Sequence, residues 1–172
     1  MKNYMKKIAF FLMAVTLLIP IVSAITPPTL HCLQKIKYIA PYEGVDSGAW
    51  VGTISIPASP SHTYDIVQWA DPTPTWYGPP ATLGITFPGS LEIFHEEWEI
   101  RDKEGVVLAR GYDEGYFDIE KAEWVVFGEV TEVLEGGELE YLEDYLLRVR
   151  GKVTVRKGVF HGRGRWKFWK NQ

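Results

Sequence analysis

The second half of this chain alternates apolar and polar residues with a period of two. Successive side chains of a β-strand point to opposite faces of the sheet, so this period predicts strands with one buried face. A turn of hairpin type is expected at 102–105, and two more at Gly136-Gly137 and Lys157-Gly158. The strands are expected at 91–101, 106–112, 116–119, 124–134, 139–155 and 159–169.

Earlier strands are predicted at 36–39, 49–56 and 64–69. Beyond the N-terminal segment, the sequence has no sustained apolar period of the helical kind. Regularly spaced strands joined by tight turns are typical of antiparallel barrels and sandwiches. The fold class predicted is therefore all-β, with an antiparallel barrel or a strongly curved sandwich as its architecture.

Residues 57–90 interrupt the regular pattern, because they hold seven of the 11 prolines. Proline has no backbone N–H to donate to a sheet, so apart from 64–69 this stretch is expected to be a loop insertion. Loops of this length are often functional. Two interpretations stay open, a lid over a site and a plug packed on a barrel end.

The first 24 residues have the order of a secretory signal peptide. Three lysines precede an apolar run over 8–22, which is followed by Val22-Ser23-Ala24. The run is shorter than the roughly 20 residues of a membrane-spanning helix. We therefore expect residues 1–24 to be cleaved and 25–172 to form one exported domain, with no membrane span after cleavage.

The charge of the chain is negative and unevenly distributed. Its net charge is −4, which gives no general attraction to nucleic acid, so no nucleic-acid partner is expected. Residues 91–144 hold 18 acids and four bases, whereas nine bases and no acid follow Asp144. The favoured interpretation is that basic strands pair beside acidic ones. The alternative is a site for a polyanion.

No motif for a metal or cofactor is present. The four histidines lie far apart in the sequence, and Cys32 is the only cysteine, so neither a metal site nor an internal disulfide is expected. No serine lies in a nucleophile elbow, and Gly162-Arg163-Gly164 is not a phosphate loop. No cofactor is predicted.

Candidate site residues come from polar side chains at positions where the pattern requires apolar ones. Glu96 shares a strand face with Phe94 and Trp98. In the same way, Glu143 is expected on the inner face of 139–155, between Tyr141 and Tyr145.

A third strand supplies a possible partner for these carboxylates. Arg110 lies on the face of 106–116 that also carries Tyr112. A buried carboxylate is costly unless it is paired, so Arg110 is the expected partner of Glu96 or Glu143. The alternative is a bulge, because one extra residue turns every later side chain to the other face.

These patterns support three hypotheses of function. The first is an exported barrel that binds an apolar or aromatic small molecule, or acts as an interaction module outside the membrane. The second is an isomerase or cyclase that uses Glu96 or Glu143 as its base and Arg110 as an electrostatic stabiliser. The third is a structural protein of the cell envelope without a pocket.

Export predicts the N-terminus of the secreted product. N-terminal sequencing of material recovered outside the producing cell should begin near Ile25, because Val22-Ser23-Ala24 presents small residues where signal peptidase cleaves. A soluble cytoplasmic product that retains Met1 would contradict this prediction.

Overall fold

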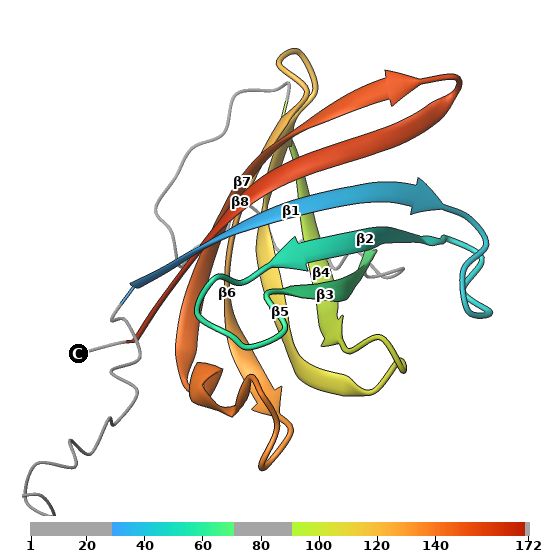
Figure 1. Ribbon diagram of the computed structural model, residues 1–172. Coiled ribbons are helices and arrows are strands. Elements are labelled where there is room, and N and C mark those ends of the chain that lie inside the picture. Colours follow the sequence, from blue (N-terminus) through green and yellow to red (C-terminus); the bar gives the residue numbers. More distant parts are fainter. Residues whose placement is uncertain (1–28, 71–90, 171–172) are drawn as a thin grey trace, which may run out of the picture.

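A closed antiparallel barrel of eight strands accounts for most of residues 29–70 and 91–170, which are the part of the chain that the computed structural model describes (Figure 1). Each strand pairs with the next one in the sequence, and the last pairs back with the first. The predicted all-β antiparallel barrel is thus confirmed, whereas residues 1–28 and 71–90, with the signal segment and most of the proline-rich stretch, lie outside the described part. The strands are β1 (Thr29–Ile39), β2 (Ala49–Ser55), β3 (Thr63–Ala70), β4 (Leu91–Arg101), β5 (Val107–Asp118), β6 (Glu123–Val133), β7 (Tyr145–Arg156) and β8 (Val159–Lys170).

One end of the barrel is closed by packing and hydrogen bonds. The 3-10 helix η1 (Glu140–Leu142) lies here, and Leu142 is fully buried together with Leu139 and Ile56. The Tyr64 hydroxyl donates a hydrogen bond to the carboxylate of Glu138 at 2.6 Å, which ties the β2–β3 region to the β6–β7 connection. These contacts make this end a solid core.

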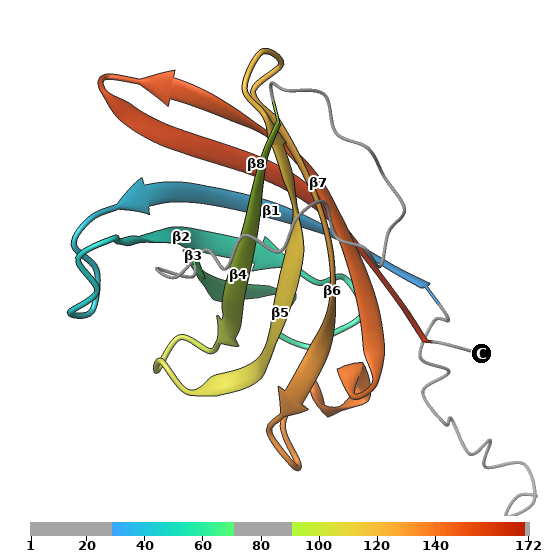
Figure 2. The ribbon, with the colours of Figure 1, turned by 180° about the vertical axis from the view of Figure 1, so that it is seen from behind.

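The opposite end is where the hairpin tips spread apart. Seen from both sides, the tips of the β1–β2 and β7–β8 hairpins diverge from the β5–β6 turn (Figures 1 and 2). Several large apolar side chains at or near these turns are exposed, among them Ile119, Val155 and Phe160. We call this the open end.

A bulge corrects the expected orientation of Arg110 and Tyr112. Leu108 and Ala109 are consecutive in β5 and both buried, and the β4–β5 register shifts there: Ile100 pairs with Ala109 but Arg101 with Val107, which leaves Leu108 as the extra residue. The shift reverses the faces of all following residues. Arg110 and Tyr112 therefore lie on the outside, and their expected inward orientation is wrong.

The expected strand over 139–155 begins later than the sequence pattern indicated. Residues 140–142 form η1, and Asp144 has a φ of 64°, so the strand starts only at Tyr145. Leu139 and Leu142 are buried at a spacing of three, which suits a helical turn rather than a strand. Glu143 is consequently exposed, and its expected inward orientation is wrong.

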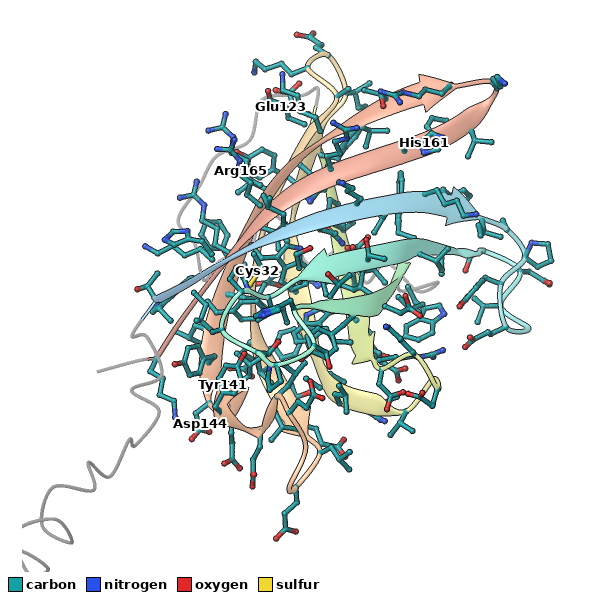
Figure 3. The ribbon with its side chains drawn as sticks, in the orientation of Figure 1. Cys32, Glu123, Tyr141, Asp144, His161 and Arg165 are labelled. Atoms are coloured by element: carbon teal, nitrogen blue, oxygen red, sulfur yellow. The ribbon has the colours of Figure 1, made fainter. Side chains whose placement is uncertain are left out.

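The outside of the barrel carries a basic face over β7, β8 and β1. Glu123 of β6 pairs with Arg150 at 3.3 Å and with Lys152 at 2.8 Å, as expected for a basic strand beside an acidic one. The outer face of β8, however, lies between two basic strands, and Arg165 points away from the barrel there (Figure 3). The exposed cations of this face are Lys35, Lys37, Arg148, Arg150, Lys152, Arg156, Arg163, Arg165 and Lys167.

Inside the barrel, the ring of Trp124 fills space that glycines leave. A Cβ atom added at Gly151 would lie 2.1 Å from this ring, and one added at Gly162 or Gly164 would lie 3.1 or 3.2 Å from it. The glycines of β7 and β8 have no side chain at these positions, and this allows the Trp124 ring of β6 to pack directly against their backbone.

Replacing Gly151 by alanine should destabilise the barrel. The added methyl group collides with the Trp124 ring, so we expect Gly151→Ala to lower the free energy of unfolding by about 1–3 kcal/mol, as overpacking of a core does. Equilibrium urea denaturation followed by tryptophan fluorescence measures the change.

Thr154→Ala is the control, since Thr154 lies on the same strand but is exposed. It should change the free energy of unfolding by no more than about 0.5 kcal/mol. Equal stabilities for Gly151→Ala and the wild type would show that Trp124 does not depend on this glycine.

Candidate binding cavity and its buried carboxyl pair

A cavity of about 360 Å³ opens at the open end of the barrel. Each of the eight strands contributes at least one side chain to its wall. Six of these side chains are aromatic, and the wall is mostly apolar. The lining residues are Ile36, Tyr38, Trp50, Gln68, Phe94, Glu96, Phe117, Trp124, Val153 and Phe160.

Glu96 and Gln68 form the polar floor of this cavity. Only 9% of Glu96 is exposed, and the side-chain amide of Gln68 donates a hydrogen bond to its Oε2 at 3.0 Å. Gln68 in turn accepts a hydrogen bond from the Nε2 of Gln34. Gln34 accepts one from the Nε1 of Trp166 at 3.0 Å.

These bonds make a relay that crosses the interior from β8 through β1 and β3 to β4. Every link has its donor on the Trp166 side and its acceptor on the Glu96 side, so the relay directs hydrogen-bond donors toward the carboxylate. Both glutamines are only 2% exposed, and each has its partners within the relay. The side-chain amides of both glutamines thus have hydrogen-bond partners, as buried polar groups require.

A second carboxyl group stands beside Glu96. Asp113 of β5 is directly opposite Glu96 of β4 in the sheet register, and it is fully buried. Side chains at such positions have Cβ atoms about 4.5–5.5 Å apart. Among the described residues, neither the Asp113 carboxyl nor the indole N–H of Trp98 has a hydrogen-bond partner.

Burial raises the pKa of both carboxyl groups, because it disfavours their charged forms. The pKa of Glu96 is raised to about 7. The pKa of Asp113 is raised well above its ordinary value by burial and, further, by the neighbouring Glu96. The two groups titrate as a coupled pair, and burial favours a proton on the pair up to near neutral pH.

Of the residues predicted from the sequence, Phe94 and Glu96 line the cavity. Trp98 is fully buried one position deeper, with its ring edge-on to Trp166 at a centroid distance of 5.5 Å. Tyr145 is buried and Tyr141 half-buried at the closed end, where Figure 3 labels Tyr141.

Arg110, the expected partner of the inner carboxylates, pairs on the outside with Glu132 at 3.4 Å and Glu99 at 3.9 Å. It thus contacts neither Glu96 nor Glu143. Tyr112, 46% exposed, and the exposed Glu143 likewise lie away from the cavity.

Three functional candidates were missed by the sequence analysis. Gln34 and Gln68 each interrupt the apolar face of an alternating strand, so the signal that singled out Glu96 was available for them as well. Asp113 was hidden, because the bulge at Leu108 places it on the face that simple alternation assigns to solvent.

Within residues 29–70 and 91–170 there is no group of three or more His, Cys, Asp or Glu side chains that could hold a metal ion. In the same described ranges, no helix is long and apolar enough to cross a membrane. Comparisons of the chain with models of known protein families, with curated proteins and with solved structures find no match.

The carboxyl pair predicts how stability depends on pH. The folded chain holds the Glu96 proton up to about pH 7, whereas the unfolded chain releases it near the ordinary value of 4.5. The folded state thus binds more protons over this interval, and the pair's contribution to stability falls as the pH rises through it. Above about pH 7 the contribution of Glu96 to stability no longer changes with pH.

Replacing Glu96 by glutamine should remove this loss. We expect Glu96→Gln to exceed the wild type by roughly 1–3 kcal/mol in unfolding free energy at pH 8, and to match it at about pH 4. Urea denaturation at the two pH values measures both differences. Glu97→Gln, on the exposed side of β4, is the control and should follow the wild type. Parallel pH profiles for Glu96→Gln and the wild type would contradict the assignment.

Proposed function

We propose that this chain is an exported binding protein that holds an apolar or aromatic small molecule in the cavity at the open end of the barrel. Export is supported by the basic, apolar and small-residue order of residues 1–24. The ligand class is supported by the cavity wall, which is mostly apolar and carries six aromatic rings.

The observation that carries the proposal is the combination of apolar walls with a single polar floor. Small-molecule sites are usually concave, about 300–1,000 Å³ in volume and lined by apolar side chains, with a few polar groups that orient the ligand. This cavity has about 360 Å³, and Gln68 and Glu96 supply those polar groups. The relay behind them holds Glu96 in one position.

Acid–base catalysis is the second candidate, and the proton held by Glu96 and Asp113 favours it. An isomerase or cyclase, however, also needs a group that stabilises negative charge developing on the substrate. Arg110, proposed for this role, lies outside the barrel, and within 29–70 and 91–170 no positively charged side chain lines the cavity. We therefore favour binding over catalysis. A purely structural envelope protein accounts for the solid closed end but not for the cavity.

Blocking the cavity should abolish binding. We expect the neutral fluorescent probe N-phenyl-1-naphthylamine to bind the wild type, with a blue-shifted and stronger emission. Val153→Trp places a large ring in the cavity, since Val153 lines it, and should weaken probe binding at least tenfold.

Thr154→Trp is the matched control, because the next residue on β7 faces solvent. It should bind the probe as the wild type does. Equal binding by the two tryptophan variants would place the probe elsewhere on the protein, and no binding by the wild type would argue against a ligand-binding function.

A further inference from the structure

The cavity holds acidic groups without a counter-ion. Glu96 lies at its floor and Asp113 beside Glu96, whereas the lining residues that the structure describes include no Lys, Arg or His. Basic side chains of β4 have their partners elsewhere. Arg101 contacts Glu43 and Glu99, each at 2.8 Å, and His95 faces Glu114 at 3.5 Å.

A buried carboxylate is stable only when a cation or hydrogen-bond donors compensate its charge. Gln68 gives Glu96 one hydrogen bond, and the Asp113 oxygens have none among the described residues. The described residues therefore compensate the negative charge of the buried carboxyl pair only in part. A ligand that places a positive charge at the floor of the cavity would compensate the rest.

The cavity wall suits a cation as well. The faces of aromatic rings attract organic cations, most strongly where water is excluded. The six rings around the cavity are those of Tyr38, Trp50, Phe94, Phe117, Trp124 and Phe160.

We propose that the ligand of this cavity is an organic cation: an apolar or aromatic molecule whose protonated amine binds Glu96 at the floor while its body lies among the aromatic rings. The proposal deepens the proposed binding function and rests on it. It selects one charge class from the apolar and aromatic molecules that the walls admit.

Few titratable groups face this position. They are Glu96 from β4, Asp113 from β5 and, higher on the wall, Tyr38 from β1, whose hydroxyl donates to the Ser47 carbonyl. The neighbouring residues on the other strands do not titrate. They are Gln68 of β3, Gly128 of β6, which is opposite Asp113, and Trp166 of β8. Protonation of Glu96 below about pH 7 removes the negative charge that an amine would bind.

Three probes of nearly equal shape test the charge class: phenylpropylamine, phenylpropanol and phenylpropionate. Isothermal titration at about pH 7.5 should show the amine binding about tenfold or more tightly than the alcohol, and the carboxylate weakest. The advantage of the amine over the alcohol should shrink at about pH 5.5, where Glu96 is protonated.

Glu96→Gln should reduce the amine to the affinity of the alcohol and leave the alcohol unchanged. Glu97→Gln makes the same change of charge one residue away, on the exposed face, and should keep the preference for the amine.

The possible failures are distinct. If the alcohol binds as tightly as the amine and Val153→Trp weakens both, the cation proposal is overturned and the binding function stands. If the neutral naphthylamine probe and all three phenylpropyl compounds fail to bind the wild type, both are overturned. A preference for the amine that survives in Glu96→Gln also overturns the proposed site.

Discussion

The ladder between β1 and β8 is the constraint on which the rest of this structure depends. It pairs the nine residues Thr29 to Lys37 with Trp169 to His161, and it leaves the eight-stranded sheet without a free edge. A closed sheet encloses a volume that inward side chains must fill. Large side chains such as Leu139, Leu142 and Phe168 fill the closed half, whereas mostly aromatic side chains line the open half and leave a cavity there.

A polar layer separates these two halves. The relay from Trp166 through Gln34 and Gln68 to Glu96 crosses the interior just below the cavity. Its amides are satisfied, but the adjoining Asp113 is buried without a hydrogen-bond partner among the described residues. A buried polar group without a hydrogen-bond partner lowers stability, and natural proteins keep such groups mainly at functional sites. The carboxyl pair is therefore the part of the interior with which a ligand is expected to interact.

Alternation in the sequence predicts side-chain orientation only where no bulge or helical turn interrupts the strand. Alternation identified β4 correctly, and with it Phe94 and Glu96, because no bulge lies between Phe94 and Ile100. On β5 the bulge at Leu108 reversed the faces, so that Arg110 and Tyr112 were expected inside and Asp113 outside. Ahead of β7, Leu139, Tyr141 and Tyr145 fit the alternation of a strand although residues 140–142 form a helical turn, and Glu143 was misplaced for that reason.

By itself, the sequence determined that the chain forms antiparallel strands with one apolar face, because a period of two is a property of the backbone and is legible in any single strand. It also identified Glu96 as a carboxylate on an apolar face. Only the tertiary structure decided that β8 pairs with β1, that Asp113 stands beside Glu96 and that two glutamines join Trp166 to this carboxylate. These are contacts between strands far apart in the sequence, and they depend on register and closure, which no local pattern encodes.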